Sequence, residues 1–293
     1  MNRKYASQDN LAKHLASLVG FRTIKARSIG NKDRIAELLR NSWFTELLFQ
    51  ETSKHLNLIQ YQIPWSMVQA YYTIYLSVRA YFHSFNRVVG THHSATLRTL
   101  VSDFMAYKNR FPFPWCCYFK GDPFQSSVVI SNAPGLSSIS LSNPLSSVYT
   151  NDPWQHFGLF LKTTRKRQVE NAISNWKQKN NRKNIKENEK RDLIMKLQPT
   201  SFFDALYRIR ARSNYVDVDS FSFGNVKESD AMNLHLELKN IIDKTLFVFE
   251  MMIGKSLGIA WLSNEVKIFS SVKTCASCHS TVVKRLKVYE GYL

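Results

Sequence analysis

Apolar residues recur at helical spacing along most of this chain. Between residues 32 and 57 they form the 3.6-residue stripe of an amphipathic helix, at Ile35, Leu38, Leu39, Trp43, Leu47 and Leu48. Pro64 is expected to break the helical pattern, and Gly254 to stop the last long helix. Four further helices are predicted, over about residues 66–88, 94–109, 201–214 and 228–254. Five helices with short connections predict a mainly α fold, an antiparallel helical bundle.

A long segment between the third and fourth of these helices has a different composition. Residues 111–151 are rich in proline and serine, and 126–131 and 137–141 are predicted as short strands of a hairpin. Asp152-Pro153 then supplies the cap and first turn of a basic helix. The sequence therefore predicts four segments: the first bundle helices in 1–110, an insertion in 111–197, the last bundle helices in 198–254 and an appendage in 255–293.

The second half of this insertion concentrates positive charge. Its candidates for nucleic-acid binding, together with Arg210 and Arg212 further on, are Lys162, Arg165, Lys166, Arg167, Lys177, Lys179, Arg182 and Lys183. Trp154 and Trp176 lie among them, which suits a phosphate backbone with occasional base stacking. The 293-residue chain carries a formal charge of +18, which favours a polyanion as partner: nucleic acid first, an anionic membrane surface second. A solvated, lysine-rich helix is the alternative.

Three arginines at every second position mark the fourth predicted bundle helix: Arg208, Arg210 and Arg212. Arg208 and Arg212 are four residues apart, so a helix presents their guanidinium groups on one face. Three polar residues follow within the next turn: Ser213, Asn214 and Tyr215. This face could grip a phosphate, because arginine offers a fixed fork of donors to phosphate oxygens. A solvated helix with an arginine-rich outer face is the alternative.

Two segments together carry a recognisable pattern. The first holds Ala70-Tyr71-Tyr72, then Arg79-Ala80, then the step Thr91-His92-His93-Ser94. The second holds Arg208, a gap of four residues, Ser213 and then Tyr215. Over roughly residues 36–110 and 198–254 the chain resembles the HEPN family, small helical bundles found in prokaryotic toxins, RNA-cleaving enzymes and defence proteins. The resemblance implies an RNA-acting protein of a prokaryotic defence or toxin–antitoxin system, as a homodimer or as a subunit of a defence complex.

The chain departs from this family at Ser213, where catalytic members carry a histidine. Serine does not titrate near neutral pH, so another group would have to move the proton. The other histidines of the predicted bundle are His83, His92, His93 and His235. If the protein is a metal-independent endoribonuclease, the spacing of these residues predicts that Arg208 stabilises the phosphorane, that Asn214 orients it, and that Tyr215 positions the ribose or donates a proton. The alternatives are a non-catalytic subunit that binds nucleic acid, RNA before DNA, and a scaffold that docks an acidic protein.

The C-terminal appendage contains a Cys-x-x-Cys-His string. Cys275, Cys278 and His279 are candidate zinc ligands in half of a zinc ribbon, with the Cys116-Cys117 pair as a source of further ligands. The alternating run at 281–289 is predicted as a strand. The string also matches the attachment pattern of c-type haem, which requires export to an oxidising compartment. Reduced cysteines in a small hairpin, and core packing of Cys116-Cys117, are the alternatives without metal or haem.

Several classes of protein are disfavoured by what the sequence lacks. It has no run of about 18 apolar residues, so no membrane span is expected. Residues 1–20 lack the compact apolar block of a signal peptide, which predicts a cytoplasmic protein with reduced cysteines. It also lacks the glycine-rich phosphate-binding motifs, the Gly-x-Ser-x-Gly elbow and the His-Glu-x-x-His motif.

Overall fold

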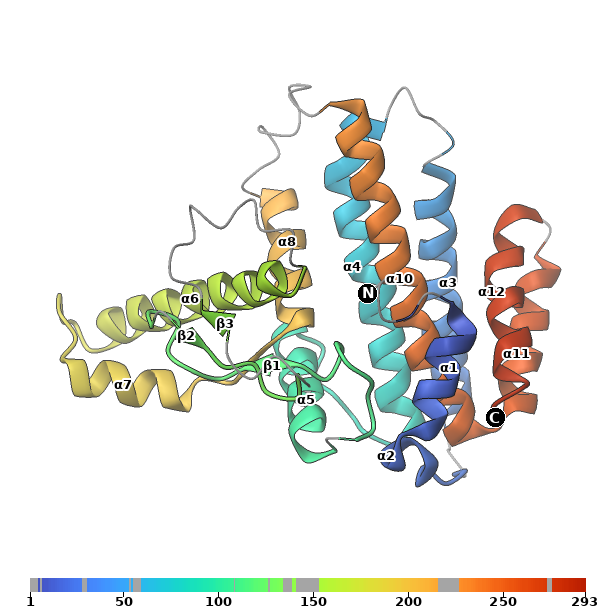
Figure 1. Ribbon diagram of the computed structural model, residues 1–293, viewed down its shortest axis with the longest axis horizontal. Coiled ribbons are helices and arrows are strands. Elements are labelled where there is room, and N and C mark those ends of the chain that lie inside the picture. The colour runs from blue at the N-terminus through green and yellow to red at the C-terminus, as the bar shows by residue number, and fades with distance from the viewer. Residues whose placement is uncertain are drawn as a thin grey trace. The chain divides into compact units, whose positions relative to one another are not determined.

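A computed structural model shows a mainly helical chain (Figure 1), as the sequence predicts. The structure describes residues 5, 7–27, 31–52, 54, 59–107, 109–125, 127–133, 139–140, 153–215, 227–272 and 276–293. Unit 1 comprises residues 1–96, 109–112 and 209–293, and unit 2 comprises residues 97–108 and 113–208. Helices α5 (His93–Ala106) and α8 (Phe202–Tyr215) each continue from one unit into the other. The segment boundaries predicted after residues 110 and 197 therefore do not coincide with the units.

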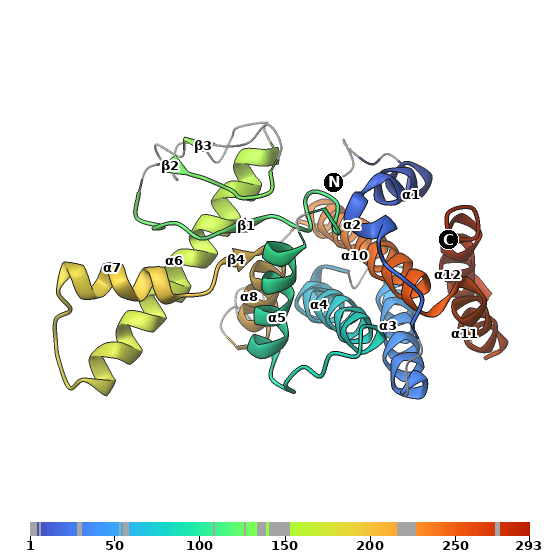
Figure 2. The same cartoon turned by 90° about the horizontal axis from the view of Figure 1, so that it is seen from below.

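Unit 1 is built on three long helices, α3 (Lys32–Thr52), α4 (Ile59–Ser84) and α10 (Glu228–Leu257). Figure 2 shows these three helices side by side, seen nearly end-on. Unit 1 also contains four shorter helices: α1 (Gln8–Ser17), α2 (Val19–Arg22), α11 (Ile259–Ser271) and α12 (Ala276–Tyr289). Large side chains such as Trp43, Tyr81 and Phe249 are buried in this core.

Pro64 lies inside α4, so the prediction that it breaks the helix is wrong. Proline lacks the N–H that would otherwise bond to the carbonyl oxygen of Gln60, one turn earlier in α4. Ile59 and Ile63 are fully buried together with Ala231 of α10. Met67, in the turn after the proline, packs against the same cluster, so apolar contacts lie on both sides of Pro64.

Helices α4 and α10 run in the same direction. Their first turns share the cluster of Ile59, Ile63 and Ala231. Near their last turns the Ser256 hydroxyl donates a hydrogen bond of 2.6 Å to the carbonyl oxygen of Ser84. The prediction of an antiparallel bundle is therefore wrong for this pair, because the long segment between the two helices lets the chain start both at the same end.

Helix α10 ends at Gly258, not at the predicted Gly254. Gly258 has a φ of 94°, a left-handed conformation that favours glycine, and α11 begins at the next residue. At Gly254 an added Cβ would approach Cδ1 of Leu293 to 2.6 Å. Gly254 therefore allows close packing inside the helix and does not stop it.

The run at 281–289 is part of helix α12, so the predicted strand is wrong. Val282, Leu286 and Tyr289 are buried at spacings of four and three residues, which is the helical repeat. Arg285 is buried on the same side and interrupts the apolar pattern. The β-branched residues of this run favour a strand locally, and packing against α3 and α10 overrides that preference.

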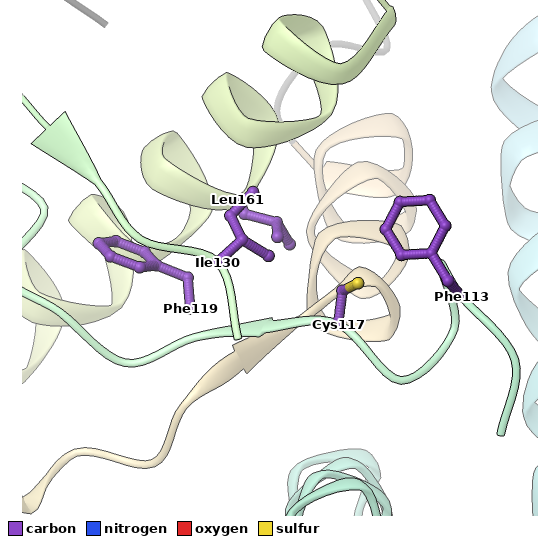
Figure 3. Packing of buried hydrophobic residues seen from close by; sticks show 5 residues of the cluster. All are labelled: Phe113, Cys117, Phe119, Ile130 and Leu161. Atoms are coloured by element: carbon purple, nitrogen blue, oxygen red, sulfur yellow. The ribbon is translucent and has the colours of Figure 1, made fainter. Parts of the chain in front are cut away.

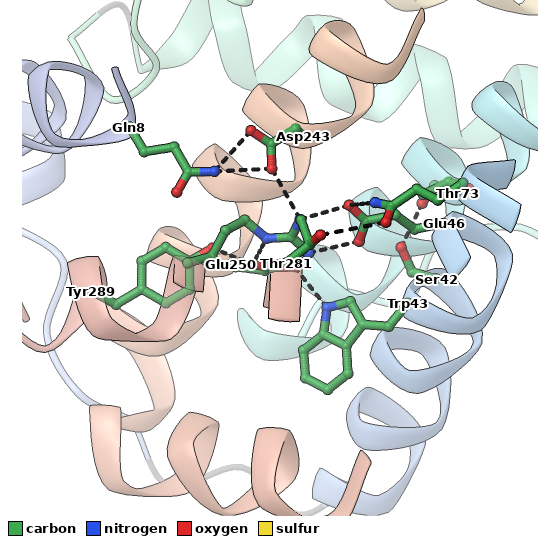
Figure 4. A network of polar contacts seen from close by, with 11 residues as sticks. Gln8, Ser42, Trp43, Glu46, Thr73, Asp243, Glu250, Thr281 and Tyr289 are labelled. Carbon is green, nitrogen blue, oxygen red and sulfur yellow. Dashed lines mark hydrogen bonds and ion pairs between the residues drawn. The ribbon is translucent and has the colours of Figure 1, made fainter. Parts of the chain in front are cut away.

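Arg285 joins α12 to α3 and α10 through a buried polar network (Figure 4). Its guanidinium nitrogens lie 2.7 Å and 2.8 Å from the carboxylate oxygens of Glu46, and 2.9 Å and 3.0 Å from those of Glu250. Asp243 accepts a further bond at 3.2 Å, and the Tyr289 hydroxyl donates to Glu250. Burial raises the pKa of Glu46, and the charge and hydrogen bonds of Arg285 oppose that rise. The C-terminal helix is thus fixed to the bundle by one arginine and three carboxylates.

Unit 2 combines helices α6 (Pro153–Lys179) and α7 (Glu187–Lys196) with short antiparallel strands. Strand β1 (Tyr118–Phe119) pairs with β4 (Thr200–Ser201), and β2 (Ser127–Val128) pairs with β3 (Ile139–Ser140). The β2–β3 pair confirms the pairing predicted for residues 126–131 and 137–141. One buried cluster of this unit joins Phe113, Cys117, Phe119, Ile130 and Leu161 (Figure 3). Cys117 therefore packs in the core, which confirms the prediction of core packing for this residue.

Arg165 lies inside unit 2 and caps the end of α7. It is 0% exposed, and its guanidinium donates to the carbonyl oxygens of Ile194 at 2.9 Å, Lys120 at 3.2 Å and Gln198. Carbonyls at and just beyond a helix C-terminus lack helical partners, which explains this use of an arginine. Burial lowers the pKa of Arg165 to about 10. The prediction that Arg165 binds nucleic acid is therefore wrong.

Candidate functional site

The arginines of α8 are separated by their helical phase. Residues two apart on an α-helix point roughly 200° apart, so Arg208 and Arg210 meet different partners. Arg208, in unit 2, donates to the hydroxyl oxygens of Thr163 at 3.1 Å and Thr164 at 3.3 Å. Ser213 is buried, with 3% exposure. The other predicted members have side chains outside the described residues: Arg212, Asn214 and Tyr215.

Arg210, not Arg208, meets the tyrosine pair of α4 within unit 1. Its Nη2 donates to the Tyr72 hydroxyl at 2.7 Å, and its guanidinium carbon lies 5.3 Å from the centre of the Tyr72 ring. A guanidinium held this way combines a hydrogen bond with a cation–π contact. One side chain, Tyr72, therefore positions Arg210 both through its hydroxyl group and through its ring.

His93, the first residue of α5, lies on the same tyrosines. Its Nδ1 is 2.8 Å from the Tyr71 hydroxyl, and its ring centre is 4.4 Å from that of Tyr75 and 5.7 Å from that of Tyr72. Burial lowers the pKa of His93, and the charges of Arg210 and Arg79 lower it further. The imidazole is consequently neutral near pH 7 and able to accept a proton.

The sequence of α4 explains why these groups converge. At about 100° per residue, positions 71, 72, 75 and 79 fall within an arc roughly 100° wide. The Tyr71 and Tyr75 rings are stacked with centres 5.7 Å apart, and the Tyr75 hydroxyl donates to the carbonyl oxygen of Thr91 at 3.4 Å. This second contact anchors the residues just ahead of α5 on α4. We call Tyr71, Tyr72, Tyr75, His93 and Arg210 the tyrosine–histidine–arginine cluster.

The cluster contains the groups that phosphoryl-transfer chemistry requires. A neutral imidazole can remove a hydroxyl proton, and a guanidinium can bind and stabilise the charge of a phosphate. Tyrosine hydroxyls add hydrogen-bond donors beside them. Sequence reasoning named His93 among several histidines and favoured Arg208 over Arg210. The missing information was which face of α8 meets α4.

The basic helices of unit 2 carry a second candidate surface. Two of the predicted side chains, Lys162 and Lys177, are half-buried. Five are exposed to solvent: Lys166, Arg167, Lys179, Arg182 and Lys183.

Aromatic rings accompany these charges. The ring centre of Phe124 lies 4.9 Å from Nζ of Lys190 and 6.0 Å from Nζ of Lys166, and the Arg182 guanidinium carbon lies 5.8 Å from the Trp176 ring centre. The side chain of Trp154 lies outside the described residues. Aromatic rings beside cations suit nucleic acid.

The remaining histidines and cysteines offer no second site in the part of the chain that is described. His235 is fully buried and stacks on Phe49 with ring centres 4.2 Å apart, and burial lowers its pKa to about 4. Among the described residues no three His, Cys, Asp or Glu side chains gather as metal ligands. The predicted zinc ligands have side chains outside the described residues: Cys275, Cys278 and His279. The zinc site therefore stays a prediction.

Protein-family models, curated proteins and solved structures were compared with the chain, and none of them matches it. The HEPN resemblance thus stays a prediction that rests on the short segments quoted from the sequence. Within the described ranges no helix is both long enough and apolar enough to cross a membrane. The cluster and the basic residues of unit 2 are therefore the features from which a function can be inferred.

Proposed function

We propose that this protein binds RNA and cleaves it at the tyrosine–histidine–arginine cluster. One observation carries the proposal: a neutral imidazole and a guanidinium, His93 and Arg210, are both fixed on adjacent tyrosines of α4. His93 stands in for the histidine that is missing at position 213. The buried Ser213 has no part in the reaction.

In the proposed reaction His93 removes the proton of a ribose 2′-hydroxyl. The 2′-oxygen forms a bond to the adjacent phosphorus, and the bond from phosphorus to the 5′-oxygen breaks. Arg210 stabilises the negative charge that develops on the phosphorane oxygens. The leaving 5′-oxygen takes up a proton from the imidazolium or from water, which gives a 2′,3′-cyclic phosphate and a 5′-hydroxyl end.

The basic surface of unit 2 supports the RNA-binding part of the proposal. Most of the lysines and arginines predicted there are exposed, and a chain with a net charge of +18 attracts polyanions. Phe124, whose ring centre lies 6.0 Å from Nζ of Lys166 and 4.9 Å from Nζ of Lys190, adds an exposed aromatic ring beside two cations. These residues bind the RNA and take no part in its cleavage.

The biological setting of the proposal comes from the HEPN resemblance. The resemblance implies a component of a prokaryotic defence or toxin–antitoxin system, as a homodimer or as one subunit of a defence complex. The proposed location, the cytoplasm, is the expectation from the sequence of residues 1–20. The loss of a motif histidine at Ser213 favours a second candidate, a subunit that binds nucleic acid without cleaving it.

The two arginines of α8 provide the test. With a labelled RNA, Arg210→Ala is expected to lower the cleavage rate by about 100-fold or more, because it removes the stabilising cation. Arg208→Ala, which loses the hydrogen bonds to Thr163 and Thr164 and removes no group of the cluster, is the matched control and retains the rate. Equal effects of the two substitutions would refute the assignment. Binding without any cleavage by the wild-type protein would select the second candidate.

A further inference from the structure

Two large aromatic side chains on α4 are exposed. Tyr61 is 53% exposed and Trp65, four residues later, is 67% exposed. A single exposed apolar residue is ordinary, but two large rings one helical turn apart form a patch that calls for an explanation. Both lie in unit 1, on the helix that carries the tyrosines of the cluster.

The helix places these rings in line with the cluster. At about 100° per residue, positions 61, 65, 72 and 79 fall within an arc roughly 40° wide. A rise of about 1.5 Å per residue puts Trp65 about 6 Å from Tyr61 and about 10 Å from Tyr72 along the axis. The exposed rings therefore lead along one face to the place where Arg210 rests on Tyr72.

The charge of this face selects an anionic occupant. None of the 26 residues of α4 is an aspartate or glutamate, and its arginine, Arg79, lies at the cluster end of the row. An anionic strand on the helix would approach Arg79 and Arg210 without repulsion from α4 itself. Exposed rings followed by arginines are the arrangement that binds single-stranded nucleic acid, with bases on the rings and phosphates on the cations.

We propose that the exposed face of α4 binds single-stranded RNA, with one base stacked on Trp65 and the next on Tyr61. This inference rests on the proposed function, and it makes an unpaired stretch of RNA the substrate. Stacking on these rings carries the strand past Tyr72, so that a neighbouring phosphate reaches Arg210. Base faces inside a duplex are covered by the adjacent base pairs, so a duplex cannot use the rings. Stacking reads no sequence, because every base has a flat face.

The test compares Trp65→Leu with the wild-type protein in binding to a labelled single-stranded RNA and to the same sequence as a duplex. Leucine keeps an apolar side chain but removes the ring. Single-strand affinity is expected to fall roughly 5- to 100-fold, with duplex affinity and salt dependence unchanged. Leu48→Ala is the matched control, since Leu48 is an apolar residue of α3 with 60% exposure, and it leaves the affinity unchanged.

The possible failures point to different conclusions. Unchanged single-strand affinity in Trp65→Leu, beside normal binding by the wild type, overturns the stacking proposal and leaves the proposed function standing. A changed oligomeric state with unchanged RNA affinity also overturns it, and would assign the face to a protein partner. A wild-type chain that binds neither form of RNA refutes the proposed function itself.

Discussion

Arg285→Met is expected to cause a large loss of stability. Methionine fills much of the same space but removes the guanidinium that bonds to Glu46 and Glu250 in the network of Figure 4. Glu46 and Glu250, which are almost fully buried, then lose the group that neutralises them. Breaking a buried ion pair from one side costs about 3–5 kcal/mol, a large part of the roughly 5–15 kcal/mol that stabilises a typical domain.

The assay is thermal unfolding followed by circular dichroism. At roughly 2–4 °C per kcal/mol, the melting temperature of the Arg285→Met variant is expected to fall by about 6–20 °C. Arg34→Met is the matched control, because Arg34 and Glu37 form an ion pair of 2.6 Å that is exposed to solvent. Exposed pairs contribute at most about 1 kcal/mol. Similar losses in the two variants would refute the view that burial makes the Arg285 network important.

The pH dependence of this variant gives a second readout. Burial raises the pKa of Glu46, and without Arg285 its charge no longer opposes that rise. A carboxyl with a raised pKa in the folded state favours folding below its unfolded pKa, and this contribution is lost as the pH rises through the folded value. The deficit of Arg285→Met is therefore expected to shrink between about pH 7 and pH 5. A deficit that grows in acid would contradict this account.

Three further substitutions test other parts of the structure. Burial lowers the pKa of His235 from 6.5 to about 4, so the unfolded chain takes up this proton first and stability is lost as the pH falls. The free energy of unfolding is expected to fall by about 2 kcal/mol between pH 7 and pH 5. His235→Phe should remove this pH dependence in urea titrations. A pH dependence that persists in the variant would have to come from another group. In the same assay Arg165→Met should lower the free energy of unfolding by about 2–3 kcal/mol. Lys166→Met, at an exposed position, should lower it by less than about 0.5 kcal/mol. Equal losses would contradict the capping of α7 by Arg165. Because the pKa of His93 is lowered, the cleavage rate is expected to fall in acid only below pH 6.5. Arg79→Gln should move this fall to higher pH, since the charge of Arg79 lowers the pKa of His93. An unchanged pH profile would argue against His93 as the base.

Long amphipathic helices could be predicted because their apolar stripes are buried as the period requires. The stripe that begins near residue 32 becomes α3, and the one that begins at 228 becomes α10. Failures occur where packing outweighs a local preference. Pro64 stays inside α4, where Ile59, Ile63 and Met67 pack on α10. The helical stripe of α12 was missed because a buried charged residue, Arg285, interrupts its apolar pattern.

The candidate site could be predicted in its residue types but not in its partners. The tyrosines of α4 and an arginine of α8 were identified from the sequence alone. The choice between Arg208 and Arg210 depends on the rotation of α8 about its axis, which no local pattern records. Arg165 shows the same limit, since a basic helix can turn one arginine inward to cap a neighbouring helix.

The most direct test of the central claim compares His93→Ala with His92→Ala in a cleavage assay on single-stranded RNA. The two histidines are adjacent in sequence, but His93 lies on Tyr71 while His92 is exposed. Loss of a general base lowers a rate by about 100- to 10,000-fold, so His93→Ala should be almost inactive and His92→Ala near wild type. Full activity in His93→Ala would contradict the assignment of the tyrosine–histidine–arginine cluster as the cleavage site.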